Sequence, residues 1–387
     1  MNVRHIIQKS MLAAVAALTI SSCDMMTEDL SDCPTGLYVN FVYDYNIQRA
    51  DMFKDHVGGL TLYVYDESDR LVTQRTVSGS ELQTYGYNIH FTEEELAPDH
   101  SYRLQAVAMQ KDWDTALTTP GAKYRKTDMA AGADRKSFTV KLDRTASSQP
   151  PYFNVSNAAP LDTMWHTLTM LNATAANIPG VTKYHQNADG TVQSNGIDLV
   201  KVVSGEPTYA TVSLIRDTNH LNISLREIDH PEDVDHEDYE VFIVDANGDV
   251  DYQNSLIIPT DSLIYRPYAA WTTTYDGNGT MGVQRSAHYD LMFNRLKYSP
   301  TPRENAVLCI RKKSTNQDIA VLNLAEILSE GRTAYEIYSY KPQEYLDREY
   351  DYRLEFFLKG EEWEQISELY VCIDVLSWAK RIQIENL

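Results

Sequence analysis

The sequence predicts an all-β protein made of two tandem β-sandwich domains behind an export signal and a short tether. Short stretches rich in β-branched and aromatic residues recur along the chain, and turn-forming residues separate them. The 387 residues exceed the usual size of one hydrophobic core. Helical patterns are scarce, with the best candidate at 321–329. Two sandwiches in tandem account for these observations together.

The first 22 residues have the order of an export signal. Basic residues precede an apolar stretch at 11–20, which is too short to span a bilayer as a helix. The run from Ile20 to Cys23 then resembles the lipoprotein processing box, in which an aliphatic residue and two small residues precede a cysteine. We therefore expect cleavage between Ser22 and Cys23 and acylation of Cys23. An ordinary signal peptide beside a chance cysteine is the alternative.

Residues 23–35 form a polar, acidic tether, a composition typical of a flexible spacer. Two or more acyl chains hold a soluble domain at a membrane, whereas one chain binds only marginally. Since no other run approaches eighteen apolar residues, we expect the lipid on Cys23 to be the only membrane anchor. Acidic residues just after such a cysteine resemble a label for export to the outer face of an outer membrane, which predicts surface display.

The first sandwich domain is predicted at 36–195. Apolar side chains alternate from Leu37 to Tyr43, as in a half-buried strand. Residues 113–195 are less regular, and the domain boundary is placed near their end. Further strands are expected at 60–66, 71–77, 87–91, 102–108 and 137–142.

The second sandwich domain is predicted at 196–387. Two features of the first domain recur in it: the strand, aspartate and tight turn at 63–72 reappear at 242–251, and Tyr102-Arg-Leu reappears as Tyr352-Arg-Leu. This similarity indicates related domains. The strands of this series are expected at 197–203, 208–216, 221–228, 239–244, 307–311, 352–358 and 369–376.

The charge of the chain argues against a nucleic-acid partner. The formal net charge is -21, and the signal holds two of the 34 bases and no acid, which leaves 32 bases against 55 acids. That is the wrong sign for binding phosphate groups. A well-solvated exterior explains the acidity without any special partner.

The four cysteines lack the spacing of a zinc or redox site. If Cys23 carries lipid, three remain: Cys33, Cys309 and Cys372. The last two lie in apolar, strand-like runs, where a buried free thiol is the favoured interpretation. A disulfide between Cys309 and Cys372 stays open.

Oxygen ligands stand at alternate positions in Asp245, Asn247, Asp249 and Asp251, as in a calcium-binding loop. The glycine of this segment is displaced from the place that such a loop requires, and no glutamate completes the set. Asn-Gly is also a strong hairpin signal, so we favour a hairpin turn at 247–248 and predict no metal.

Two other clusters have a functional and a structural interpretation. The acidic segment at 230–238, with a histidine near each end, has groups that bind metals, but an exposed solvated loop is favoured. Six tyrosines between Tyr335 and Tyr352 offer platforms for sugars, but tyrosine is also common on half-exposed strands, which we favour.

No catalytic motif or cofactor motif is recognisable, so neither an enzyme nor a cofactor is predicted. The chain lacks a Gly-x-Ser-x-Gly elbow, a Walker loop and a His-Glu-x-x-His motif. Residues 277–282 match the letters of a dinucleotide-binding loop, but no helical pattern follows them, so a plain loop is the better interpretation.

A family resemblance joins these features. Cys33-Pro34 opens an aromatic strand that reaches Asn46, and Ala-Asp-Met-Phe at 50–53 and Leu-Tyr-Val-Tyr-Asp at 62–66 follow it. Behind a processing box, this order resembles the opening of the FimB-type fimbrial anchor lipoproteins. Weaker likeness continues through Met164-Trp165-His166 and Leu199-Val-Lys-Val-Val to Trp378.

The resemblance implies two transthyretin-like (Ig-like) sandwiches and an outer-membrane lipoprotein that anchors a type V pilus, with roles in fimbrial assembly, length control and cell adhesion. Its implied partners are stalk or accessory pilin subunits, which join by β-strand addition. The alternative is a surface glycan-binding lipoprotein of a nutrient-uptake system.

Overall fold

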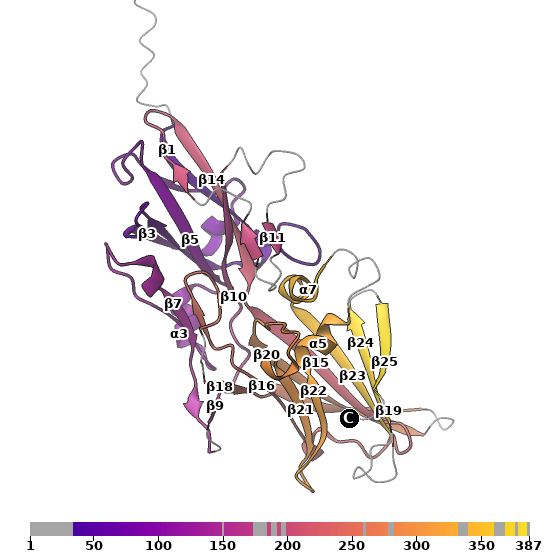
Figure 1. Cartoon of the computed structure of the whole chain (residues 1–387). Helices are drawn as coiled ribbons and strands as arrows, with labels where there is room; N and C mark the ends of the chain where they lie inside the picture. Colours follow the sequence, from indigo (N-terminus) through magenta and orange to yellow (C-terminus); the bar gives the residue numbers. More distant parts are fainter. Residues whose placement is uncertain are drawn as a thin grey trace, which may run out of the picture.

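The computed structural model describes residues 34–148, 151–172, 184–186, 192–194, 199–257, 261–277, 282–331, 340–359, 368–375 and 378–384. Over these ranges the chain is mostly β structure, arranged as two halves that follow one another along the long axis of the molecule (Figure 1). The prediction of a β-rich protein is therefore confirmed.

The first half contains one eight-stranded sheet, in the order β3-β2-β5-β10-β14-β1-β4, with β13 beside β5. The pairing of β1 with β14 is parallel, while that of β1 with β4 is antiparallel. The strands are β1 (Gly36–Val42), β2 (Gly59–Tyr65), β3 (Leu71–Ser78), β4 (Ile89–Phe91), β5 (Ser101–Met109), β10 (Met164–Asn172), β13 (Val200–Lys201) and β14 (Pro207–Arg216).

This sheet curls around the first core, which takes side chains from β1, β2, β4, β5 and β14. The two ends of the sheet come together, because the Arg75 guanidinium of β3 donates to the His90 carbonyl of β4 at 2.6 Å. Trp165 is wholly buried inside the curl, edge-on to the Tyr43 ring at 5.8 Å between centroids.

Strand β2 is buried on both faces. Leu60, Leu62 and Val64 belong to the first core, whereas Tyr63 and Tyr65 belong to the second. Such a strand reads as a continuous apolar run rather than an alternation. The layer over its outer face is the segment that follows β5, with α3 (Trp113–Thr118), β6 (Tyr124–Lys126) and β7 (Thr139–Leu142).

The second half packs two six-stranded sheets around the second core. One has the order β19-β20-β15-β23-β24-β25 and the other β22-β21-β16-β18-β9-β8. Their strands are β15 (Thr218–Glu227), β19 (Ala269–Asp276), β20 (Val283–Asn294), β23 (Asp351–Lys359), β24 (Glu368–Val375) and β25 (Trp378–Ile384), then β8 (Thr145–Ala146), β9 (Tyr152–Asn154), β16 (Tyr239–Asp245), β18 (Ser262–Tyr265), β21 (Val307–Lys312) and β22 (Gln317–Asn323).

The remaining elements are short. Strand β17 (Asp249–Asp251) pairs with β7, and β11 (Tyr184–Gln186) pairs with β12 (Val192–Ser194). The helices are α2 (Phe53–His56), α5 (Leu324–Ser329) and α7 (Pro342–Arg348), with 3-10 turns η2 (Gly79–Gln83), η3 (Arg135–Ser137), η4 (His236–Asp238) and η5 (Pro302–Glu304).

The chain crosses from the first half to the second at Asp217, between the end of β14 at Arg216 and the start of β15 at Thr218. Strand β14 pairs with β1 and β10 of the first sheet, whereas β15 begins at Thr218 in the second half. In the other direction, residues 139–154 supply β7, β8 and β9, which pair with β17 or join the sheet of β18. Periodicity along a sequence shows that a strand exists but not which sheet it joins.

The hairpin expected at 247–248 is wrong. Strand β16 pairs with β18 and β21, whereas β17 pairs with β7, so the two strands on either side of this turn belong to different sheets. Gly248 is needed for a close approach instead, since a Cβ there would lie 2.5 Å from the Leu263 Cδ1 atom. The repeat of 63–72 at 242–251 is thus limited to its first strand.

The helix expected at 321–329 is correct only in its second part. Residues 317–323 form β22, and helix α5 begins at Leu324. The Asn323 side chain accepts a hydrogen bond from the Glu326 backbone N–H at 3.2 Å, which is the usual role of an N-cap residue. The cap marks where the strand ends and the helix starts.

Candidate functional site: the junction between the two halves

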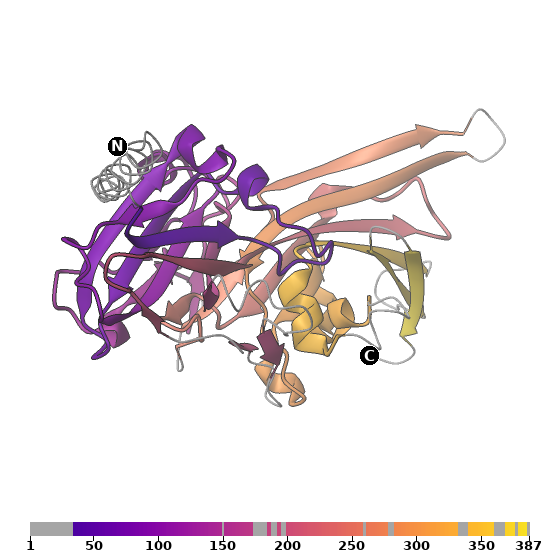
Figure 2. The ribbon, with the colours of Figure 1, turned by 90° about the horizontal axis from the view of Figure 1, so that it is seen from above.

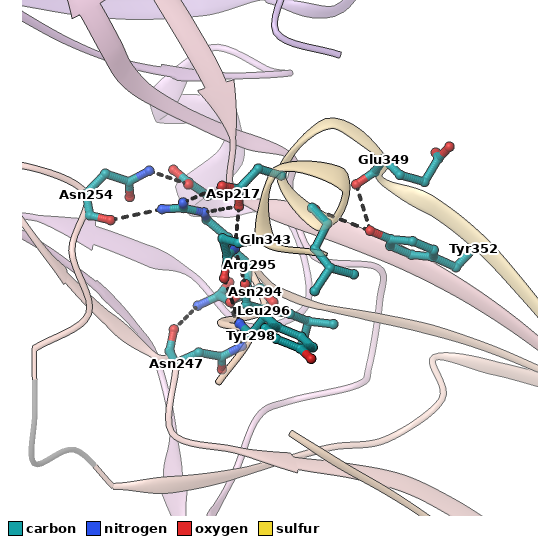
Figure 3. Close-up of polar contacts among 12 residues, drawn as sticks. Asp217, Asn247, Asn254, Asn294, Arg295, Leu296, Tyr298, Gln343, Glu349 and Tyr352 are labelled. Carbon is teal, nitrogen blue, oxygen red and sulfur yellow. Dashed lines mark hydrogen bonds and ion pairs between the residues drawn. The ribbon is translucent and has the colours of Figure 1, made fainter. Parts of the chain in front are cut away.

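The two halves meet at a buried polar network centred on Arg295, just after β20 (Figure 3). Its guanidinium donates to both carboxylate oxygens of Asp347 on α7, at 2.6 and 2.8 Å. The Asp347 side chain is fully buried, and the Arg295 side chain is 20% exposed. Burial alone would lower the pKa of Arg295, but Asp347 and Asp217 outweigh burial and raise it above its ordinary value.

This network ties the chain crossing at Asp217 to three other segments. The Arg295 backbone N–H donates to the Asp217 carbonyl at 2.7 Å, and its guanidinium donates to the Asn254 carbonyl at 3.2 Å. The Asn254 amide in turn donates to the Asp217 carboxylate at 2.6 Å. On α7, the Gln343 amide donates to the Leu296 carbonyl at 3.0 Å. One arginine therefore joins the linker, the end of β20, the loop after β17 and helix α7.

A second group of buried polar side chains joins the bridging layer, the segment with β6 and β7 that covers the outer face of β2 and also pairs with β17, to the second half. The amides of Asn247 and Asn294 donate to each other's carbonyls at 3.0 Å. The Tyr124 hydroxyl donates to the Asn294 side-chain oxygen at 2.5 Å and lies 3.1 Å from the Thr218 hydroxyl. Since Tyr124 is on β6, outside the second half, these bonds cross between the two parts of the molecule.

Two arginines stacked between aromatic rings complete the junction. The Arg216 guanidinium, at the end of β14, lies 4.0 Å from the ring centroid of Tyr350 and 5.8 Å from that of Trp165. Arg348, on α7, lies 4.0 Å from the ring of Tyr45, in the segment that follows β1. Such cation–π contacts strengthen when water is excluded. The two halves thus contact each other at several independent points.

The four predicted oxygen ligands do not converge on one point. Asn247 is fully buried and accepts from the Tyr265 hydroxyl at 2.6 Å. Asp249 forms a bidentate ion pair with Arg144 at 2.7 and 2.9 Å. The Asp251 carboxylate accepts from two backbone N–H groups of its own turn, and Asp245 accepts from the Ala246 N–H at 2.7 Å. Each of the four side chains thus has a hydrogen-bond or ion-pair partner within the chain.

Burial of the ionised Asp245 carboxylate lowers the stability of the fold, and this predicts how stability depends on pH. One carboxylate oxygen is buried without a hydrogen-bond partner, and burial raises the pKa of Asp245 to about 7. An acid whose pKa is raised on folding adds stability below its ordinary pKa and loses it as the pH rises through 7. We expect Asp245→Asn to raise the unfolding free energy by roughly 2 to 4 kcal/mol at pH 8, with a smaller gain at pH 5.

Urea denaturation of the native chain and the variant at both pH values measures this difference. Asp143→Asn is the matched control, because Asp143 lies in an ion pair with Arg125 whose side chains are 42% and 54% exposed. In the control, the unfolding free energy is expected to differ between pH 8 and pH 5 by the same amount as in the native chain. Equal stability of Asp245→Asn and the native chain at pH 8 would refute the argument.

The acidic segment at 230–238, expected to be an exposed loop, is exposed only in part, since Val234 within it is fully buried. Atoms of His230, Glu232 and Asp233 able to bind a metal lie within 4.8 Å of one another, and all three residues are exposed. His236, the other histidine of the segment, is turned away toward the Thr272 hydroxyl at 2.9 Å. The two histidines therefore do not share one site. Three exposed groups on one turn are also typical of a solvated surface.

Cys309 is a free, buried thiol, as favoured from the sequence. It lies on β21 and donates to the Asp318 carboxylate at 3.4 Å, and burial raises the pKa of its thiol to about 12. A thiol held protonated is a poor nucleophile and metal ligand. Ser22, Cys23 and Cys33 lie outside the described residues, as does the side chain of Cys372.

The tyrosine cluster does not form a sugar platform in the described residues. Tyr345 is fully buried, and Tyr340 and Tyr352 are 6% and 3% exposed. Nor are these tyrosines on half-exposed strands, since residues 342–348 form α7 and Tyr352 points into the second core. Tyr335 and Tyr338 lie outside the described residues.

The recurring Tyr-Arg-Leu does mark a common structural device. The Tyr102 hydroxyl, at the start of β5, donates to the Ala97 carbonyl at 3.0 Å. The Tyr352 hydroxyl, at the start of β23, donates to the Glu349 carbonyl at 3.0 Å. In both places the tyrosine fixes the loop before a core strand, as the tyrosine corner of sandwich domains does.

These observations define a class: a β-rich protein of two halves, joined firmly at a buried junction. Within the described part of the chain, no helix is long and apolar enough to cross a membrane. The structure resembles that of a candidate adhesin of Bacteroides thetaiotaomicron, at a TM-score of 0.66 and 24% identity over 91% of this chain and 99% of that one. It also resembles the fimbrial anchor protein Mfa2 of Porphyromonas gingivalis, at a TM-score of 0.53 and 15% identity over 90% and 99%.

The chain belongs to the family of fimbrillin-A associated anchor proteins Mfa1 and Mfa2, whose family model matches residues 30–384. This is a family of fimbrial anchors and not of enzymes, and its description implies association with fimbrillin at the cell surface. A candidate polysaccharide-binding protein of Bacteroides thetaiotaomicron shares the fold, at a TM-score of 0.62 and 24% identity over 90% and 99%. No curated protein sequence matches the chain significantly.

Proposed function

We propose that this protein is an outer-membrane lipoprotein that fixes the base of a fimbria, a type V pilus, to the cell surface. The observation that carries the proposal is the match of the anchor family to residues 30–384, which begins seven residues after Cys23. In this proposal Ser22 and Cys23 flank the cleavage site, residues 1–22 are removed, and acyl chains on Cys23 hold the protein in the membrane.

The mature chain is proposed to hold two transthyretin-like sandwiches after the tether at 23–35. The pairing of β14 with the first sheet and of β15 with the second favours a division at Asp217. The similar tyrosine contacts of Tyr102 and Tyr352 favour a common origin for the two sandwiches.

An anchor must carry a pulling force from the fimbria to the membrane. Two domains on a flexible linker would extend under load, whereas a junction with a continuous core and buried ion pairs resists separation. The second core contains side chains from both halves, including Tyr63 and Met109 of the first sheet and Leu221 of the second. This continuity supports a role in which the two halves move together as one rigid body behind the tether.

The proposed partners are stalk or accessory pilin subunits that join by adding a β-strand, where backbone hydrogen bonds provide affinity and alternate side chains provide register. Roles in fimbrial assembly, length control and cell adhesion are part of the proposal. We do not propose glycan binding, because three of the six tyrosines that motivated that alternative, Tyr340, Tyr345 and Tyr352, are buried, and the half-buried Tyr350 ring is covered by the Arg216 guanidinium.

Deletion of the chain in its native host tests the function. We expect a deletion strain to shed most of its fimbriae into the medium or to carry fimbriae of altered length, and the native chain supplied in trans to restore them. Electron microscopy and fractionation of cells and medium give the counts. Fimbriae that stay attached at the native number and length in the deletion strain would refute an anchoring role.

A further inference from the structure

Strand β19 is an edge strand of the six-stranded sheet β19-β20-β15-β23-β24-β25. Its eight residues pair with β20 in an unbroken register, from Ala269 opposite Asp290 to Asp276 opposite Val283. Among the residues that the structure describes, no strand pairs with the other edge of β19. Figure 2 shows β19 and β20 running out together beyond the rest of the second half. The backbone N–H and C=O groups of the outer edge are thus available for another strand.

The sequence of β19 lacks the usual protection of a sheet edge. Ala-Ala-Trp-Thr-Thr-Thr-Tyr precedes Asp276 and contains no charge, no proline and no glycine. Natural edge strands carry charged side chains, prolines or bulges, which prevent pairing with other chains. β-branched and aromatic residues also favour strand pairing. An unprotected edge of this length is therefore a template for strand addition.

Other long edges of the two halves are protected. In the first sheet, β3 carries Arg75, which bonds across to β4, and its register shifts between Val64 and Tyr65 of β2. The pairing of β22 also shifts, between Ile310 and Arg311 of β21. Strand β25 carries adjacent Lys380 and Arg381. Only β19 combines length, an even register and the absence of charge among these four edges.

Contacts with β20 already hold the exposed side chains on one face of β19 in place. Trp271 is 38% exposed and Tyr275 is 61% exposed. Trp271 is stacked on the His288 ring, with centroids 5.2 Å apart and planes at 22°, and His288 lies 2.8 Å from the Thr273 hydroxyl. Side chains held in place lose little entropy on binding, so this face is prepared for a contact.

We propose that β19 is the edge to which a partner subunit adds an extended, uncharged strand of about eight residues. The added strand would support the outer part of β19 and β20, because β15 pairs with β20 only over 287–294 and leaves the part of β19 at 273–276 with β20 as its one neighbouring strand. One face of the added strand lies beside Trp271 and Tyr275, and the other lies beside Ala270 and Thr274. The inference rests on the proposed function for the identity of the partner as a pilin subunit.

A different protein fits this edge better than a second copy of the chain. Each mature copy has 32 bases against 55 acids, so two copies brought edge to edge repel each other. A strand without charge from another subunit avoids that repulsion. It also meets no charged side chain along β19 until Asp276.

The test places charge on the edge without touching the interior. Ala270 and Thr274 are exposed, and the structure gives their side chains no hydrogen bond or ion pair. In a host strain whose only copy carries Ala270→Glu with Thr274→Glu, we expect cell-bound fimbriae to fall at least tenfold while the protein stays in the membrane fraction. The matched control is Gln74→Glu with Ser78→Glu, which puts the same charges at the same spacing on exposed positions of β3.

The control strain is expected to keep its fimbriae. Fimbriae at the native number in the β19 variant would overturn the inference, and the deletion strain then shows separately whether anchoring itself still holds. Concentration-dependent dimers of the native chain in sedimentation, lost in the β19 variant, would also overturn it by making a second copy the occupant.

Amide hydrogen exchange removes the dependence on a variant that folds. Native chain bound to fimbriae sheared from the deletion strain is expected to exchange at least tenfold more slowly over 269–276 than free chain. Residues 71–78 on the control edge are expected to exchange equally in both samples. Binding without slower exchange at 269–276 would overturn the inference while leaving anchoring intact.

Discussion

Arg295→Ala is expected to lower the melting temperature of the protein by roughly 3 to 5 °C, the largest stability change that we predict for a single side chain. The substitution leaves the fully buried Asp347 carboxylate without its bidentate partner. An unpaired buried charge costs about 3 to 5 kcal/mol, and each kcal/mol shifts the melting temperature of a chain this long by about 1.2 °C, because the unfolding entropy grows with chain length. The lower end applies because Arg295 is 20% exposed.

The exposed pair Arg125 and Asp143 is the matched control for this experiment. Both side chains are about half exposed, so Arg125→Ala is expected to cost less than about 1 kcal/mol. Replacing both buried partners, as Arg295→Met with Asp347→Leu, is expected to recover part of the loss because no charge is left unpaired. If Arg295→Ala has the same melting temperature as the native chain, the stability of the junction does not depend on this ion pair.

Cys23→Ala is expected to release the protein from the membrane. With no acylated cysteine, the only predicted membrane anchor is lost, and the acidic mature chain has no attraction to an anionic surface. We expect labelled fatty acid to disappear from the protein and the protein to leave the membrane pellet. Metabolic labelling and fractionation of the native host give both readouts.

Cys33→Ala is the control, since it removes a thiol from the same tether without removing the predicted lipid site. This variant is expected to keep the label and to stay in the membrane fraction. Label and membrane association that survive in Cys23→Ala would show that the chain is held in another way.

The sequence predicted the strands that alternate, because a half-buried strand leaves a period of two in its own residues. Strand β1 was found in this way. Strands β19 and β20 were missed, although Ala287, Tyr289, Leu291 and Phe293 alternate along β20 and are all buried. That alternation was an available signal for β20.

The bridging layer and the junction could not be predicted from local pattern. Strands β6, β7 and β17 have three or four residues each, and packing against β2 and β5 holds them in place. Arg295 is one of 34 basic residues, and its partner Asp347 lies 52 positions away. Contacts between distant segments leave no period in the sequence, so neither the crossing at Asp217 nor its network was visible.

The central claim is that the lipid on Cys23 holds fimbriae to the cell through this protein. The most direct test counts cell-bound and shed fimbriae by electron microscopy in strains that carry Cys23→Ala or Cys33→Ala as the only copy. We predict that Cys23→Ala sheds its fimbriae together with the protein, while Cys33→Ala keeps both on the cell. Fimbriae that stay attached while the Cys23→Ala protein is free in the medium would contradict the account.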